Sequence, residues 1–146
     1  MKKVLIADDL SLIRFGLENI VKSLKDFEVC YLANNGEKAI KGIIDTKPDL
    51  IILDISMPNK SGIEVLEFVK QNNEYKSIKV IMHSIHSEYE MIEKCRILGA
   101  EGYLFKDATD DEIRTAITKI MVGEKYYSET AQRLEKMIRK DTNSSL

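Results

Sequence analysis

The sequence lacks the features that mark membrane-spanning and secreted proteins. It contains no apolar run close to the ~20 residues that a transmembrane helix needs. The first apolar run follows Met1 almost directly, is short and ends in two aspartates. A signal peptide would have a longer apolar stretch and a cleavage site of small residues. We therefore expect a cytoplasmic protein with no membrane partner.

Cysteine is scarce, and neither sign of charge is in excess. Cys30 and Cys95 are too few and too far apart for a disulfide framework or a thiolate metal site, which predicts two buried free thiols. A net charge of −2 provides no basic surface for nucleic acid, so the chain alone is not expected to bind DNA well. The remaining composition, 44% hydrophobic and 32% charged over 146 residues, fits one globular domain.

Short apolar runs alternate with amphipathic stretches along the chain. Runs that are apolar on both faces predict buried strands at 4–7, 50–53 and 80–82, and weaker strand candidates lie at 29–33 and 103–105. Two apolar stripes at helical spacing lie between them, formed by Ile13, Leu17, Ile20 and Leu24 and by Ile113, Ala116, Ile117 and Ile120. Three patterns typical of capping boxes predict helix starts at Ser61 with Glu64, Ser87 with Glu90 and Thr109 with Glu112.

Five strand–helix repeats predict an α/β fold, (βα)5, with a doubly wound five-stranded parallel sheet and helices on both faces. A closed eight-fold barrel would need roughly 200 residues or more, and the chain has no internal repeat. The composition changes after Met121, where Gly123 interrupts the last helical pattern. We therefore predict a domain over 1–122 and, within 123–146, a linker helix over about 128–140 and a disordered polar tail.

Polar residues follow the predicted strands where each strand ends. Because the carboxyl ends of parallel strands meet at one edge of the sheet, these side chains should lie together. They are Asp8, Asp9, Asp54, Ser84 and Lys106. Clustered carboxylates repel one another and call for a cation, and hard oxygen ligands of this kind suit Mg²⁺. A divalent ion and a lysine beside one carboxylate make an aspartate nucleophile for phosphoryl transfer plausible.

Each of these residues also has an ordinary structural explanation. Asp8 or Asp9 alone could cap the following helix, and Asp54 alone, before a proline, could form a turn. Ser84 alone could be a strand-end hydroxyl, and Lys106 alone a solvated surface charge. Their conjunction favours a functional site, because independent turn formers need not fall at successive strand ends.

Four strings resemble response-regulator receiver domains: IADD at 6–9, LDISMP at 53–58, KSG at 60–62 and GAEGYLFKD at 99–107. The resemblance covers roughly residues 2–122 and implies the flavodoxin-like strand order 2-1-3-4-5. It also implies that Asp54 is the phosphoacceptor, and that Asp8 and Asp9 hold Mg²⁺ together with Asp54 and the backbone carbonyl of Ser56.

The resemblance assigns further roles around the acceptor. It implies that Ser84 turns toward the phosphoryl group, that Lys106 contacts it, and that Tyr103 swings inward when Ser84 moves. Ser56 and His86 occupy the positions that flank the path of the hydrolytic water. A receiver of this kind is a signalling domain, not an enzyme with an external substrate, and its phosphodonor is a sensor histidine kinase.

The strings KDAT at 106–109 and GEKYYS at 123–128 are similar to receivers of the LuxR type (NarL/FixJ), which precede a helix-turn-helix DNA-binding domain. That domain is absent from this chain, so DNA binding and control of transcription would depend on it. Receivers of this type often pair through the first and fifth helices. We therefore expect a weak homodimer that strengthens on phosphorylation, with Phe15, predicted to be exposed, at or near the contact. The alternative contact is the face formed by the fourth helix, the fifth strand and the fifth helix, around Tyr103.

Two departures from the family pattern and several alternatives remain. Ile85 stands where the family has a small residue and could narrow access to the site, and Asp107 replaces a common proline.

The alternatives are a stand-alone receiver or a phosphorelay or protein-interaction module without DNA-binding output. A dehalogenase-type phosphatase would need an acid where Ser56 stands, and a flavin module would need a phosphate-binding loop where Asp8 and Asp9 would repel phosphate.

Overall fold

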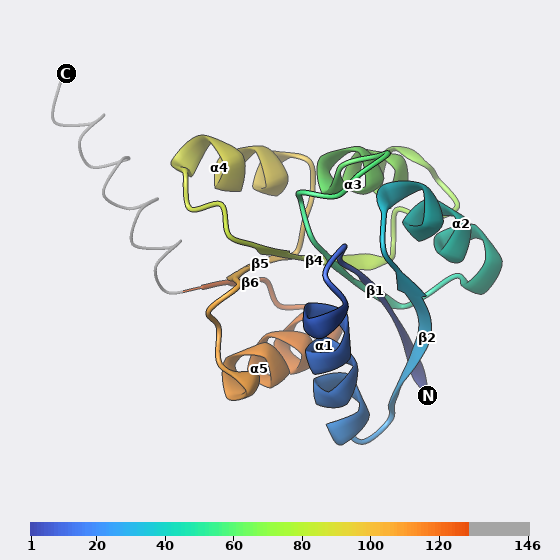
Figure 1. The fold of residues 1–146 in the computed structure, drawn as a ribbon, viewed down its shortest axis with the longest axis vertical. Helices are drawn as coiled ribbons and strands as arrows, with labels where there is room; N and C mark the ends of the chain where they lie inside the picture. Colours follow the sequence, from blue (N-terminus) through green and yellow to red (C-terminus); the bar gives the residue numbers. More distant parts are fainter. Residues whose placement is uncertain (129–146) are drawn as a thin grey trace, which may run out of the picture.

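The strands and helices alternate along the chain as the sequence predicts. The computed structural model describes residues 1–128, and Figure 1 shows their arrangement. The elements are β1 (Lys2–Ala7), α1 (Ser11–Ser23), β2 (Phe27–Ala33), α2 (Gly36–Thr46), β3 (Leu50–Leu53), α3 (Gly62–Gln71), β4 (Lys79–Ser84), α4 (Tyr89–Ile97), β5 (Gly102–Phe105), α5 (Asp110–Met121) and β6 (Tyr126–Tyr127).

The sheet is parallel throughout and has the order β2-β1-β3-β4-β5-β6. This confirms the predicted doubly wound sheet and its order 2-1-3-4-5. The prediction missed β6, which pairs Tyr126 with Gly102 and Tyr127 with Tyr103. Two residues are too short a run for periodicity to reveal, and they lie where a linker was predicted. The helix and tail predicted beyond residue 128 fall outside the described residues.

Helices cover both faces of the sheet. Figure 1 shows α1 and α5 on one side and α2, α3 and α4 on the other. Side chains of successive strand residues point to opposite faces, so in β1 Leu5 and Ala7 join one apolar cluster while Val4 and Ile6 join the other. Every residue of β3 is buried, as expected for a strand between two helical layers. The carboxyl ends of β1, β3, β4 and β5 therefore lie at one edge.

Two of the three predicted helix starts are confirmed. Ser61 and Glu64 form a reciprocal capping box at α3, and the hydroxyl of Thr109 accepts a hydrogen bond from the backbone N–H of Glu112 at α5. The Ser87 cap is wrong, because α4 begins at Tyr89 after Glu88, whose side chain makes no capping bond. The loop before α4 is held by bonds to the backbone of His86 instead.

The apolar stripe of α1 packs as predicted, with Leu17 and Ile20 buried, while Phe15 on the outer side of the helix is 65% exposed. Both cysteines are free, but only Cys95 is buried. Cys30 is half-buried because it lies on the edge strand β2, where its thiol donates to the hydroxyl of Thr46. Within residues 1–128, no helix has the length and apolar character needed to cross a membrane.

Candidate functional site

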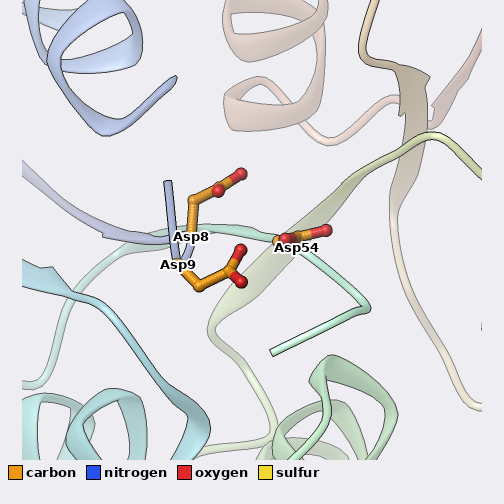
Figure 2. Close-up of side chains that lie close together, drawn as sticks. All are labelled: Asp8, Asp9 and Asp54. Atoms are coloured by element: carbon orange, nitrogen blue, oxygen red, sulfur yellow. The ribbon is translucent and has the colours of Figure 1, made fainter. Parts of the chain in front are cut away.

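Three carboxylates meet at the carboxyl edge of the sheet. Asp8 and Asp9 follow β1, and Asp54 follows the neighbouring strand β3, in which Leu53 is paired with Ala7. Figure 2 shows the three side chains gathered at these strand ends. Each offers a carboxylate oxygen, and these oxygens all lie within 4.8 Å of one another. Asp8 and Asp54 are buried and Asp9 is exposed, so the group opens to solvent on the side of Asp9.

Lys106, at the end of β5, supplies the positive charge of this group. Its ammonium contacts the carboxylate of Asp8 and lies 3.5 Å from Oδ2 of Asp54. The backbone N–H of Lys106 donates to the carbonyl of Ser84, which fixes its strand end against β4. The other carboxylate oxygen of Asp8 accepts a hydrogen bond from the backbone N–H of Leu10. The lysine is therefore closer to Asp8 than to Asp54.

Burial and the charge of Asp8 raise the pKa of Asp54 to about 6, although Lys106 opposes this. The group is 6% exposed, and burial of a carboxylate favours its neutral form. Above this pKa the carboxylate is ionised in a poorly solvated place beside another negative charge. Such a group is a competent nucleophile, and any cation that binds beside it will relieve the repulsion.

Glycine is required where α3 approaches the loop that begins at Asp54. The backbone N–H of Gly62 donates to the carbonyl of Ile55 at 2.7 Å. A Cβ added to Gly62 would lie 2.0 Å from the carbonyl oxygen of Asp54. Any larger residue would therefore displace the loop that carries the carboxylate. This close approach is the steric reason why glycine stands at the end of the KSG string.

Ser84, His86 and Tyr103 form a second group beside the carboxylates. Ser84 is buried at the end of β4, and its hydroxyl accepts a hydrogen bond from the backbone N–H of His86 at 3.0 Å. Tyr103 is fully buried, and its hydroxyl donates to the carbonyl of His86 at 2.7 Å. Burial raises the pKa of Tyr103 to about 12, which keeps the phenol protonated as a donor. Because its side chain is fully buried, the ring of Tyr103 already lies inward in this structure.

The ring of His86 faces the loop after Asp54. Its Nε2 lies 2.9 Å from the hydroxyl of Ser56, and its Nδ1 lies 3.5 Å from the carboxylate of Glu88. The backbone N–H of Ser56 donates to Asp54 at 3.4 Å. Ser56 and His86 thus bridge the loops after β3 and β4 next to Asp54. Ile85, between Ser84 and His86, is 74% exposed and is not wedged against a neighbour.

The sequence reasoning missed His83, one residue before Ser84. It is 4% exposed, and neither ring nitrogen has a hydrogen-bond partner. Burial, together with the charge of Lys106, lowers the pKa of His83 to about 4, so the ring is neutral near neutral pH. The signal was present, because a histidine directly follows the apolar run 80–82 and lies within β4. It lies on the α1 and α5 side of the sheet, where it lines a groove with Gly16 and Lys106.

The structure therefore brings most of the predicted site residues together. Asp8, Asp9, Asp54 and Lys106 form one group, and Ser84, Tyr103, Ser56 and His86 surround it. Phe15 is the exception, because it lies on the solvent side of α1.

Comparisons with known proteins give one consistent family. The model of the response regulator receiver domain matches residues 4–118. The response regulator UvrY of Escherichia coli K12 is 33% identical over 135 residues, which are 92% of this chain and 61% of UvrY. The chain thus spans about three fifths of that relative.

Solved structures agree with this. The receiver domain of the putative response regulator NarL from Mycobacterium tuberculosis is 29% identical, with a TM-score of 0.79 over 84% of this chain and 98% of that one. A DNA-binding response regulator of the LuxR family from Staphylococcus aureus is 29% identical, with a TM-score of 0.77 over 83% of this chain and 99% of that one. The similarity to the LuxR type read from the sequence is confirmed.

Proposed function

The chain belongs to the response regulator receiver domain family, and we propose that it accepts a phosphoryl group on Asp54 from a sensor histidine kinase. The observation that carries this proposal is the position of Asp54. Its carboxylate lies among the oxygens of Asp8 and Asp9, within 4.8 Å, and 3.5 Å from the ammonium of Lys106. A nucleophile flanked by a cation site and a fixed lysine is what phosphoryl transfer to a carboxylate requires.

In the proposed step an oxygen of Asp54 attacks the phosphorus of a phosphohistidine. The P–O bond forms, the P–N bond breaks, and the imidazole leaves as the neutral base after taking up a proton. Asp8, Asp9, Asp54 and the backbone carbonyl of Ser56 would hold Mg²⁺, and the hard oxygens of these groups fit that ion. When bound, Mg²⁺ would neutralise charge on the phosphoryl oxygens. Lys106 would bind a phosphoryl oxygen and stabilise the product.

We propose that Ser84 and Tyr103 carry the switch. The hydroxyl of Ser84 would turn toward the new phosphoryl group, which adds acceptor oxygens beside a hydroxyl that otherwise accepts from His86. The inward ring of Tyr103, bonded to the carbonyl of His86, would then be held in place. No external substrate is turned over, so the domain acts as a signalling element that catalyses only its own phosphorylation and dephosphorylation.

The output we propose is control of transcription in the cytoplasm, through a helix-turn-helix domain outside this chain. The support is the similarity to LuxR-type regulators, of which this chain spans only part. A stand-alone receiver, or a phosphorelay or interaction module, is the alternative. A phosphatase of the dehalogenase type is disfavoured because Ser56 stands where its second acid is needed, and a flavin module because Asp8 and Asp9 would repel the phosphate.

Incubation with Mg²⁺ and acetyl phosphate tests the proposal. The intact mass should rise by one phosphoryl group, hydroxylamine should remove it, and peptide mapping should place it on Asp54. Omitting Mg²⁺ should suppress the gain. An unchanged mass under these conditions would argue for a degenerate receiver, and turnover of a generic phosphomonoester would favour the phosphatase.

Removing the ring of His86 is expected to shorten the lifetime of the acyl phosphate. The hydrogen bond between Ser56 and His86 links the two loops beside Asp54, and we expect it to restrict the approach of water to the acyl phosphate. Such a bond contributes about 0.5–1.5 kcal/mol, so its loss should make that approach easier by a corresponding factor. His86→Ala should therefore lose the phosphoryl group about two- to tenfold faster, followed by intact mass against time. Ser87→Ala, a change at the exposed neighbour, is the control. Identical decay in both variants would make His86 a bystander.

Phosphorylation is expected to strengthen a homodimer through the outer face of α1. Phe15 is 65% exposed and is large enough to act as an anchor in such a contact. Sedimentation with and without beryllofluoride should show association that Phe15→Glu weakens by about tenfold or more. Ile44→Glu, on α2 across the sheet, should have no effect. Loss of the dimer in Ile97→Glu rather than Phe15→Glu would place the contact on α4.

A further inference from the structure

The last described strand places a second tyrosine against Tyr103. β6 pairs with β5 so that Tyr127 is the direct partner of Tyr103. The two rings are stacked, with centroids 6.5 Å apart and planes inclined by 14°. Tyr103 is fully buried and Tyr127 is 8% exposed. Because a close-packed interior leaves little free space, one ring cannot leave without a change at the other.

β6 is also bonded along the strand that carries Tyr103. The backbone N–H of Ser128 donates to the carbonyl of Tyr103 at 2.9 Å, and that of Tyr126 donates to Glu101 at 3.0 Å. The hydroxyl of Tyr127 donates to the carbonyl of Ala100 at 2.9 Å. These bonds fix β6 by its backbone on β5 and its Tyr127 ring on the Tyr103 ring.

Tyr103 connects this strand to the candidate site. The hydroxyl of Tyr103 donates to the backbone carbonyl of His86. The backbone N–H of His86 in turn donates to the hydroxyl of Ser84. A continuous path of contacts thus leads from Ser84 through His86 and Tyr103 to Tyr127. The neighbouring Tyr126 points elsewhere: its hydroxyl donates to Glu112 of α5, and its ring lies under the ammonium of Lys119.

We propose that Tyr127 is a positioning residue of the switch. We also propose that β6 transmits the phosphorylation state of Asp54 to the part of the chain that follows the domain. This rests on the proposed function of Asp54. With Tyr103 inward, the Tyr127 ring has its stacking partner and β6 is docked on β5. A phosphoryl group or its mimic on Asp54 that stabilises the inward position of Tyr103 therefore also stabilises the docked position of β6. By thermodynamic reciprocity, a docked β6 favours binding of the phosphoryl mimic.

The position of β6 in the chain makes this coupling useful. It is the edge strand of the described sheet and follows α5, so it is the covalent connection to residue 129 and beyond. An edge strand of two residues has little pairing energy of its own, and its docking depends on the tyrosine pair. An aromatic pair adds to the stability that burial of its surface provides, enough to shift such a local equilibrium about two- to tenfold.

Hydrogen exchange of the full chain, with and without Mg²⁺ and beryllofluoride, tests the proposal. The reporters are the amides of Tyr126 and Ser128, which form the β5–β6 ladder. Beryllofluoride should slow their exchange in the parent protein. Tyr127→Leu removes the ring and hydroxyl but keeps an apolar side chain, and it should lose this protection while weakening beryllofluoride binding by about two- to tenfold.

Two further variants separate the stacked ring from simple destabilisation. Tyr127→Phe loses the bond to Ala100 but retains the ring, and it should keep the response. Tyr126→Phe, on the opposite face of β6, should behave like the parent. Equal beryllofluoride affinity in Tyr127→Leu and the parent, or the same loss in Tyr127→Phe, would overturn the proposal. Phosphoryl mass gain is measured separately, so a failure of Asp54 phosphorylation is distinguishable from a failure of this coupling.

Discussion

Asp54→Asn is expected to abolish phosphoryl uptake and, in metal-free buffer, to stabilise the protein. The two effects have one origin, because the carboxylate that makes the nucleophile is also a buried charge beside Asp8. Its pKa is raised from 3.8 to about 6. Each pKa unit corresponds to about 1.4 kcal/mol, so the ionised group costs about 3 kcal/mol of folding free energy above that pKa. Asparagine has the size and charge of the protonated acid and avoids this cost.

The sign of the pH dependence follows from the raised pKa. The folded protein holds the Asp54 proton more tightly than the unfolded chain, so this group contributes most stability at low pH. That contribution is lost as the pH rises from 3.8 through about 6. The advantage of Asp54→Asn should therefore be near zero at about pH 4 and reach about 3 kcal/mol at about pH 8.

Urea unfolding at several pH values with EDTA measures this difference. Asp45→Asn, an exposed change on α2, is the control and should stay within about 0.5 kcal/mol of the parent. Mg²⁺ should stabilise the parent more than Asp54→Asn, because a bound cation relieves the repulsion that the variant has already removed. Phosphoryl uptake by Asp54→Asn equal to that of the parent would overturn the assignment of the acceptor. An unchanged free energy of unfolding would show that Asp54 is not strained by its neighbours.

His83→Leu is expected to stabilise the protein and to remove much of its acid sensitivity. Both ring nitrogens of His83 are buried without hydrogen bonds, which costs about 1–3 kcal/mol relative to an apolar side chain of similar size. Its pKa is lowered from 6.5 to about 4 by burial and by Lys106. The unfolded chain therefore binds a proton in this range while the folded protein does not.

The lowered pKa of His83 determines the direction of the change in stability with pH and the pH range in which it occurs. As the pH falls from 6.5 to about 4, the parent should lose about 3 kcal/mol of stability through His83, and above 6.5 this contribution is flat. Asp54 changes in the opposite sense over part of this range, so the comparison is made in the Asp54→Asn background. The gap between His83→Leu and its background should widen by about 3 kcal/mol from about pH 7 to pH 4.

Chemical denaturation across this pH range, with NMR titration of the histidine ring, provides the measurement. Met82→Leu, a volume-conserving change at the adjacent buried position, should keep the parent's pH profile. A difference in unfolding free energy that does not change with pH would mean that His83 has the same pKa in the folded and unfolded states, and so takes up its proton in the folded protein over this range. In that case a hydrogen-bond partner reaches the ring.

The sequence by itself determined the layers of the fold and the edge at which the site lies. Strand periodicity records which faces are buried, and runs such as 50–53 are apolar on both faces only because helices cover both. Parallel strands then bring Asp8, Asp54 and Lys106 to one edge without further information. The strings around these residues determined the family, whose receiver model matches residues 4–118. The boundary at 122 and the roles of the individual site residues stay predictions.

Only the tertiary structure decided the contacts between segments that are far apart in the chain. Lys106 lies closer to Asp8 than to Asp54, His86 bonds to Ser56, and α4 starts later than its capping pattern suggested. The two residues of β6 carry no period of their own, and Tyr127 becomes informative only because its ring packs on Tyr103. Local patterns fix the direction of a side chain, whereas its partner depends on how strands and helices pack. For the same reason His83, a polar residue after the apolar run 80–82, could be interpreted only from its neighbours in the fold, which leave its ring nitrogens without hydrogen bonds.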